Sequence, residues 1–143
     1  MTMNSKQTEK LGQKRIDVLV AAILAVNSYP VEKVVALLPN LRKAGLTSPS
    51  EVARMDYNEL IPKLVKAGYD RGQLVSIISP RLKALMVAIE ADTLSGLERA
   101  LAEHDSRLVQ DLLCQIPGIG PVVAKVALKL MQDEPSRLET SEA

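Results

Sequence analysis

The stretch IPGIGPVVAKVAL at residues 116–128 is the part of the chain that decides the fold. Two glycines, Gly118 and Gly120, flank Ile119 directly after Pro117, and an apolar run with one lysine follows. Glycine permits backbone dihedral angles that a β-carbon would forbid, and it lets another backbone come close. We therefore predict a tight turn between two helices, with Ile119 filling the gap between them.

A turn of this kind offers a place for an anion. The N–H groups of the turn and the N-terminus of the following helix point outward, and the helix dipole favours negative charge there. Such an arrangement holds a phosphodiester backbone without reading bases. The pattern predicts a helix-hairpin-helix over residues 106–131 that contacts nucleic acid, with a plain helical hairpin as the alternative.

Composition limits the rest of the fold. The chain has 143 residues, the size of one domain with a single core. It is 47% apolar but contains no Phe, no Trp and three Tyr, so aliphatic side chains must fill that core. The formal net charge is +1, so any contact with DNA has to come from a local basic patch.

Cysteine content and hydropathy exclude several classes of protein. The single cysteine, Cys114, excludes an internal disulfide and any cysteine-built zinc or iron–sulfur site. The apolar run IDVLVAAILAV at 16–26 is too short to span a bilayer and is typical of a buried helix. No signal-type cleavage pattern follows the charged start of the chain. We expect a cytoplasmic protein with no membrane partner, located at the nucleoid in a bacterium or archaeon.

Helical periodicity dominates the chain, and no segment alternates with the period of two that a half-buried strand shows. We predict one all-α domain of roughly seven to nine helices over residues 14–131. A flexible segment at 1–13 precedes it and a polar tail at 132–143 follows it. The predicted helices cover 14–27, 31–44, 49 onwards, 57–66, 73–91, 93–103, 106–115 and 121–131.

Capping signals mark several helix ends. The stretch SPSE at 48–51 has the pattern of a capping box, with proline at the first helical position. Asp56 is predicted to cap the next helix and Gly68 to end it. Either Asp105 or Ser106 is predicted to cap the first helix of the hairpin.

Three blocks resemble the helix-hairpin-helix DNA glycosylase superfamily, in particular its endonuclease III-like six-helix barrel domain. They are the apolar helix that ends in the amide of Asn27, the stretch SPSEVARMDYNELIPKLVKAGYDR at 48–71, and the hairpin. Their order and spacing fit over roughly residues 15–131. The resemblance implies an all-α, six-helix-barrel-like domain that ends in a helix-hairpin-helix and binds double-stranded DNA largely independently of sequence.

The chain departs from this family at the positions that carry its chemistry. The position of the family's nucleophilic lysine holds Val122, which cannot attack a sugar carbon. The position of the catalytic aspartate holds Thr140, and the cysteines that bind an iron–sulfur cluster in some members are absent. The resemblance therefore implies a degenerate member with no catalytic residue, no metal and no cofactor of its own.

The residues expected to contact DNA lie in the hairpin and across from it. Lys125 and Lys129 form an i, i+4 pair on an exposed face, where they are available to phosphates. By the resemblance, the turn at 68–71 faces DNA, and Tyr69 either stacks on a displaced base or packs as a cap residue. The predicted set is Pro117, Gly118, Ile119, Gly120, Val122, Lys125, Lys129, Asn27, Tyr69 and Arg71.

Three functions remain open on the sequence. The first is a non-catalytic DNA-binding protein, such as a damaged-DNA sensor or an accessory factor of base excision repair. The second is a module that binds a protein partner, or forms a homodimer, through an exposed apolar face. The third is a glycosylase or abasic-site lyase in which Lys125 lies in an apolar cleft and acts as the amine. We expect His104 at the surface or as a cap, and Cys114 as a small core residue.

Overall fold

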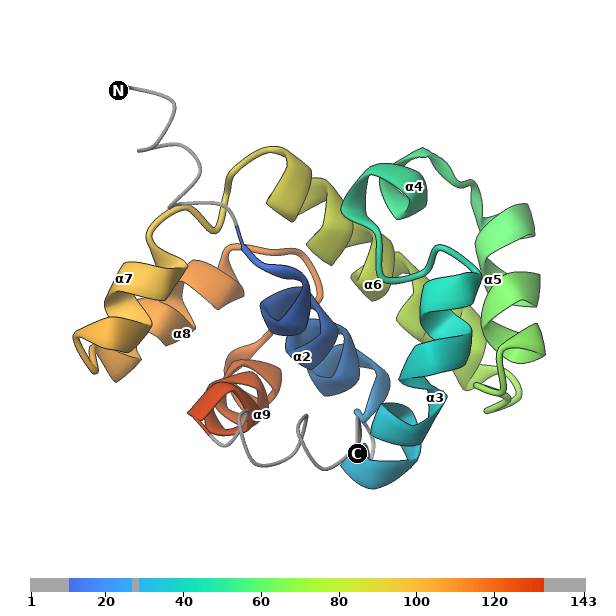
Figure 1. Cartoon of the computed structure of the whole chain (residues 1–143), viewed down its shortest axis with the longest axis horizontal. Helices are drawn as coiled ribbons and strands as arrows, with labels where there is room; N and C mark the ends of the chain where they lie inside the picture. Colours follow the sequence, from blue (N-terminus) through green and yellow to red (C-terminus); the bar gives the residue numbers. More distant parts are fainter. Residues whose placement is uncertain (1–10, 27–28, 133–143) are drawn as a thin grey trace.

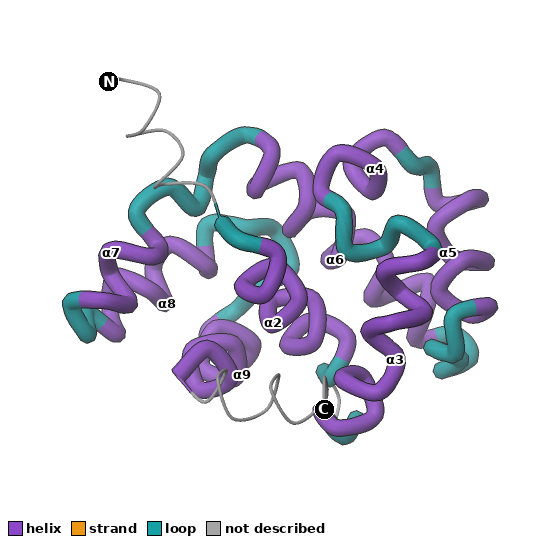
Figure 2. Tube along the Cα trace, in the orientation of Figure 1, coloured by secondary structure: helices purple, strands orange, loops and turns teal. Residues whose placement is uncertain are grey.

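The computed structural model describes residues 11–26 and 29–132, which form eight helices and no strand (Figures 1 and 2). The all-α class expected from the sequence is confirmed. Asn27, Thr140 and most of the predicted terminal segments lie outside the described residues. The helices are α2 (Gln13–Leu24), α3 (Val31–Lys43), α4 (Pro49–Arg54), α5 (Tyr57–Lys66), α6 (Leu74–Glu90), α7 (Leu97–Ala102), α8 (Ser106–Cys114) and α9 (Pro121–Gln132).

Helix α2 lies in the middle of the molecule, with α9 on one side and α3 on the other (Figure 1). Every residue from Ile16 to Leu24 is buried. A helix that is apolar all round has no face for water, so other elements must cover it on every side. Helices α3, α6 and α9 all pack against it. Each fully buried Leu, Ile or Val is worth roughly 1.5–3 kcal/mol relative to exposure.

Asp17 is the one charged residue in this buried run, and it is 1% exposed. Its carboxylate accepts a hydrogen bond from Arg42 of α3 at 2.6 Å and another from Gln13 at 2.9 Å. Gln13 also donates to the carbonyl of Thr47 at 3.1 Å. A buried carboxylate is tolerated when it is paired and hydrogen-bonded. This network therefore fixes how α2 is rotated against α3.

Four helices end with a left-handed residue two positions past their last helical residue. These residues are Gly45, Gly68, Asp92 and His104, with φ of 78°, 113°, 61° and 58°. The next N–H in each case bonds a carbonyl five residues earlier, as in a Schellman motif: Leu46 to Leu41, Tyr69 to Leu64, Thr93 to Ala88 and Asp105 to Ala100. The predicted stop at Gly68 is confirmed. Asp92 and His104 adopt the same conformation with a β-carbon, which costs free energy.

Two of the predicted N-caps are confirmed and one is not. The carboxylates of Asp56 and Asp105 accept from backbone N–H groups three residues on, at 3.0 and 3.2 Å. The capping box at 48–51 does not form, since the side chain of Ser48 makes no cap bond. The N–H of Ser48 donates instead to the carbonyl of Gly45 at 3.3 Å, so it has no need of the Glu51 carboxylate.

The helix predicted over 93–103 is shorter than expected, because α7 begins only at Leu97. Asp92 and Gly96 both have left-handed backbones, with φ of 61° and 94°. These two residues bracket a turn in which the N–H of Ser95 bonds the carbonyl of Asp92 at 3.0 Å. The prediction of helix at 93–96 is therefore wrong.

His104→Gly should stabilise the protein. Glycine reaches the left-handed conformation without the steric cost of a β-carbon, so we expect the free energy of unfolding to rise by about 0.5–1 kcal/mol. Urea denaturation followed by circular dichroism measures this change. His104→Ala is the matched control, because it removes the imidazole but keeps the β-carbon, and it should not stabilise. Equal stabilisation by both variants would mean that the imidazole, and not the backbone, is the source of the strain.

Candidate nucleic-acid interface

Helices α8 and α9 pack against each other and are joined by the turn at 115–120. Ile116 and Ile119 are buried in this turn, and the N–H of Ile119 bonds the carbonyl of Ile116 at 3.0 Å. Ile119 is thus buried as the sequence predicts, and it anchors the turn from inside. Val109 and Leu113 of α8 are buried on the same core. The two helices form a rigid hairpin whose turn is held from within, which leaves the outer side of the turn for contacts with a ligand.

Gly118 is required by the fold itself. Its φ is 90°, and a β-carbon at this position would lie 2.7 Å from the Cγ atom of Arg81 on α6. The left-handed backbone and the close approach to the Arg81 side chain both exclude a larger residue. Gly118 therefore allows the turn to pack closely against α6.

Gly120 has a different role from Gly118. It is not among the residues with positive φ, and no described atom lies within 4 Å of where its β-carbon would be. The expectation that both glycines serve an unusual backbone conformation is therefore wrong for Gly120. Its carbonyl accepts from the N–H of Ala124 at 2.9 Å, so it occupies the N-cap position of α9. The space above it is open.

Backbone N–H groups that bond no described backbone carbonyl lie in the turn and at the start of α9. The N–H groups of Gly118 and Gly120 bond no backbone carbonyl among the described residues. Those of Val122 and Val123 belong to the first turn of α9, where no intrahelical acceptor exists. The dipole of a 12-residue helix adds partial positive charge at the same end. The start of α9 can therefore accept an anion such as a phosphate.

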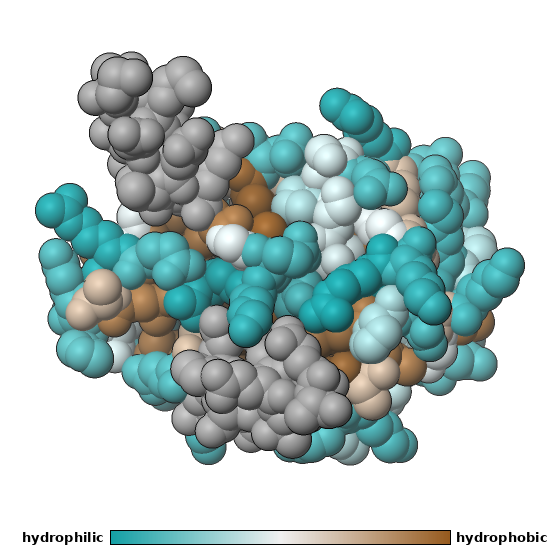
Figure 3. Space-filling model, viewed as in Figure 1, coloured by the Kyte–Doolittle hydropathy of each residue, from teal (hydrophilic) through white to brown (hydrophobic). Residues whose placement is uncertain are grey.

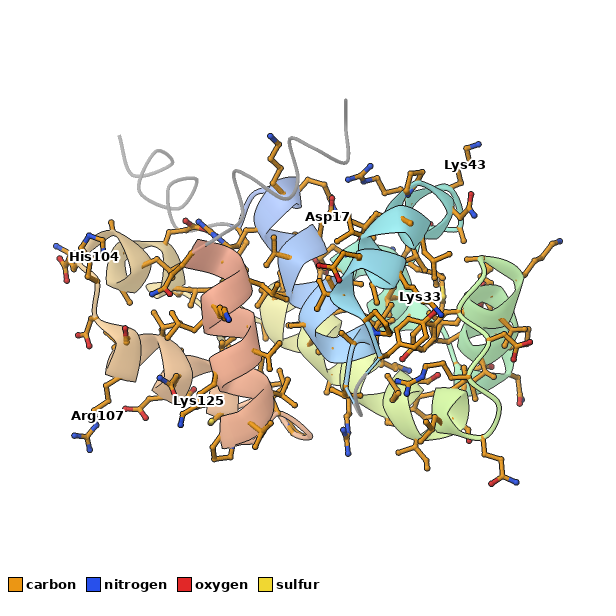
Figure 4. All side chains as sticks on the ribbon, turned by 90° about the horizontal axis from the view of Figure 1, so that it is seen from below. Asp17, Lys33, Lys43, His104, Arg107 and Lys125 are labelled. Carbon is orange, nitrogen blue, oxygen red and sulfur yellow. The ribbon has the colours of Figure 1, made fainter. Side chains whose placement is uncertain are left out.

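Basic side chains lie along α9 and on the neighbouring helix α8. Lys125 and Lys129 are both exposed, as their spacing predicts. Arg107 projects from α8 on the same side of the hairpin as Lys125 (Figure 4). The predicted set does not include Arg107, which lies in the first turn of α8. The exposed Asp111 on α8 adds one negative charge to this surface.

Val122 is exposed to 76%, more than any other large apolar side chain that the structure describes. It has no nucleophilic group, and Lys125 one turn further on is exposed to solvent. A lysine nucleophile would need an apolar cleft, whereas Lys125 is exposed. Pro117 is also exposed, on the other side of the turn, where it lines a groove beside α6.

Tyr69 and Arg71 hold the C-terminal end of α2. Tyr69 is fully buried, and its hydroxyl donates to the carbonyl of Leu24 at 2.5 Å. Arg71 donates to the carbonyl of Val26 at 2.6 Å, and its guanidinium lies 4.6 Å from the centre of the Tyr29 ring. Of the two alternatives for Tyr69, the structure shows the packed one, because its ring has no exposed surface that could stack on a base. Both side chains instead satisfy carbonyls that the end of a helix leaves unpaired.

His104 and Cys114 lie at the surface. The expectation for His104 is confirmed, whereas that of a core position for Cys114 is wrong. Val109, Leu113 and Ile116 take the inward positions of α8 and its end, and Cys114 lies about 100° round the helix from Leu113. Among the described residues, no three His, Cys, Asp or Glu side chains lie together in a way that could hold a metal ion.

The face seen in Figure 3 is largely hydrophilic, with hydrophobic surface showing in limited areas. None of the described helices is long and apolar enough to cross a membrane. Comparison with protein-family models, curated proteins and solved structures finds no match to this chain. The assignment of the interface therefore rests on the hairpin geometry described above.

Replacing Tyr69 by Phe should change how stability depends on pH. Burial raises the pKa of the Tyr69 hydroxyl above its ordinary value, and the hydrogen bond and charge of Arg71 only partly oppose this effect. Because the folded-state pKa is raised, the contribution of Tyr69 is full below about pH 10 and is lost as the pH rises through the raised pKa. Tyr69→Phe should lack this part of the alkaline loss.

At pH 8 the same variant should be less stable by about 1 kcal/mol, because the hydroxyl no longer bonds Leu24. Thermal unfolding between pH 8 and pH 11 measures both effects. Tyr57→Phe, which removes a hydroxyl from an exposed ring, is the control. An identical alkaline profile for Tyr69→Phe and the native protein would show that the buried hydroxyl contributes nothing to it.

Proposed function

We propose that this protein binds double-stranded DNA through the sugar–phosphate backbone, with the α8–α9 hairpin as its contact, and without reading base sequence. The observation that carries the proposal is the open space over Gly120, where no described atom beyond its chain neighbours lies within 4 Å of an added β-carbon, next to backbone N–H groups that bond no described backbone carbonyl. A glycine that neither the backbone conformation nor the packing requires leaves room for a ligand to come close. Phosphate oxygens are the acceptors that such donors suit.

The surrounding charges support a modest, salt-dependent affinity. Lys125 and Lys129 lie along α9, with Lys129 in its last turn, and Arg107 projects from α8 on the same side of the hairpin as Lys125, while the net charge of the whole chain is only +1. Each phosphate neutralised on duplex DNA contributes about −0.9 to the slope of log affinity against log salt. A few such contacts give weak binding in physiological salt. This behaviour fits a protein that holds DNA for other factors, such as a damage sensor or a repair accessory protein at the nucleoid.

The hairpin supports binding better than it supports catalysis. Val122 stands where the resembling family has its nucleophile, and it can act neither as a nucleophile nor as an acid or base. We therefore include no catalytic step in the proposal. The proposal includes the resemblance to the six-helix barrel, because that resemblance is the reason to expect the hairpin to face duplex DNA.

A groove beside the hairpin favours a second candidate function, the docking of a protein partner. The groove has a volume of about 360 Å³ and lies between α6 and the turn at 115–117. Two large apolar side chains on its rim, Tyr57 and Val87, are each exposed by more than two fifths. Val87→Glu separates the two functions, because it should abolish partner docking and leave DNA binding unchanged.

Gly120→Glu should remove DNA binding and leave the fold intact. A β-carbon at this position meets no described atom and needs no unusual φ, so the melting temperature should not change. The carboxylate would occupy the phosphate position and repel it, and we expect affinity to fall at least tenfold, or about 1.4 kcal/mol. Fluorescence anisotropy on a duplex of about 25 base pairs at low salt measures the change.

Gly120→Gln is the control of equal size without charge, and it should weaken binding by a smaller factor. Gly118→Glu does not serve this purpose, because its β-carbon would collide with Arg81 and disturb the turn. A folded Gly120→Glu variant with native affinity would rule out the hairpin as the DNA contact.

Lys125→Ala should weaken binding equally for every duplex sequence. Loss of one phosphate contact should also reduce the salt slope by about 0.9. Lys43→Ala is the matched control, since Lys43 is an exposed lysine on α3, far from the hairpin (Figure 4). A salt series on two unrelated duplexes tests both variants. An effect of Lys125→Ala on one sequence alone would point to base contact and against the proposed backbone contact.

A further inference from the structure

We infer that Val122 makes the hairpin selective for deoxyribose over ribose, an inference that rests on the proposed DNA binding. Val122 is the most exposed large apolar side chain among the described residues, at 76%. It lies in the first turn of α9, two residues past the open position of Gly120. The packing of the protein does not use its methyl groups, so they are available to the ligand that the neighbouring donors hold.

The direction of the Val122 side chain favours contact with a sugar. In an α-helix each Cα–Cβ bond tilts toward the N-terminus, so the isopropyl group leans toward the donors at the start of α9. In a nucleic acid, the group covalently joined to each phosphate is a sugar. A phosphate held by the N–H groups of the turn therefore brings a sugar ring next to Val122.

The rest of the exposed face of α9 matches a sugar–phosphate strand. Val122, Lys125, Val126 and Lys129 follow one another on this face, and all four are exposed. The valines offer apolar contact and the lysines offer positive charge. A strand in which anionic phosphates alternate with sugars is complementary to such a face, whereas an acidic peptide would leave the valines without apolar partners.

The chemical difference between the two sugars is the 2′-hydroxyl, the group by which a protein distinguishes RNA from DNA at a given site. Deoxyribose presents only C–H groups at this position, and these pack against the methyl groups of valine. Ribose would press a hydroxyl against them, where the side chain offers no hydrogen-bond partner. Burying an unpaired hydroxyl is unfavourable, so the ribose form should bind more weakly.

Three duplexes of identical sequence test the inference: DNA, RNA, and an RNA analogue with 2′-fluorine in place of every 2′-hydroxyl. The fluorinated duplex keeps the A-form shape of RNA but has no hydroxyl donor. We expect the native protein to bind DNA about tenfold more tightly than RNA, with the fluorinated duplex closer to DNA. Anisotropy at one low salt concentration gives the three dissociation constants.

Val122→Thr is the decisive variant, because threonine has nearly the shape of valine and adds a hydroxyl that can pair with ribose. It should narrow the preference for DNA to about two- or threefold. Val87→Thr is the matched control on α6, where a valine is also exposed, and it should keep the native preference.

Each outcome of these measurements supports or overturns the role of Val122. Equal binding of DNA and RNA by the native protein overturns the role of Val122 and leaves DNA binding itself intact. If Val122→Thr keeps the native preference for DNA, other residues cause the selectivity. If the protein binds the fluorinated duplex as weakly as RNA, the shape of the duplex causes the selectivity. Binding to none of the three duplexes overturns the proposed function and this inference with it.

Discussion

The burial of α2 on all sides is the constraint on which the rest of the structure depends. From Ile16 to Leu24 every side chain is covered, and Asp17 is covered with them. A buried apolar helix needs neighbours on each side, and a buried carboxylate needs partners in fixed positions. The first requirement brings α3, α6 and α9 together around α2. The second is met by Arg42 and Gln13, which fix the rotation of the helix.

This packing also determines where the candidate interface lies. Helices α2 and α9 lie side by side and antiparallel, so the end of α2 and the start of α9 are at the same edge of the molecule (Figure 4). Tyr69 and Arg71 bond the carbonyls of Leu24 and Val26 at that end. Both residues therefore hold the end of α2 in place at this edge.

The sequence was a good guide to elements whose signals are local. Apolar periodicity located the helices, and Asp56, Asp105 and Gly68 marked helix ends because caps and stops depend on backbone groups within a few residues. The capping box predicted at Ser48 does not form, and the N–H of Ser48 donates to the carbonyl of Gly45 instead. The second of the two helices predicted around Asp92 was begun too early, at residue 93, because the turn that the left-handed backbones of Asp92 and Gly96 bracket was not recognised.

The candidate site was harder to predict, because burial and proximity depend on tertiary packing. The sequence pattern left open whether Tyr69 stacks on a base or packs as a cap residue, and in the structure its ring is fully buried with its hydroxyl bonded to the carbonyl of Leu24. Arg107 was not predicted, because its position on the same side of the hairpin as Lys125 follows from how α8 packs on α9 (Figure 4). No local pattern distinguishes such an arginine from any other charge on a helix surface.

The two glycines of the hairpin show how a nearly neutral protein can present a site for an anion. Gly118 serves the fold, since its backbone conformation and its contact with Arg81 both exclude a side chain. Gly120 serves the surface, since nothing in the described structure requires it and the space above it is open. The donors are the backbone N–H groups of the two glycines and of the first turn of α9, which contribute no net charge. A site built in this way needs only a few lysines near it. The side chains next to the donors then determine its selectivity, and Val122 is the most exposed large apolar side chain among them.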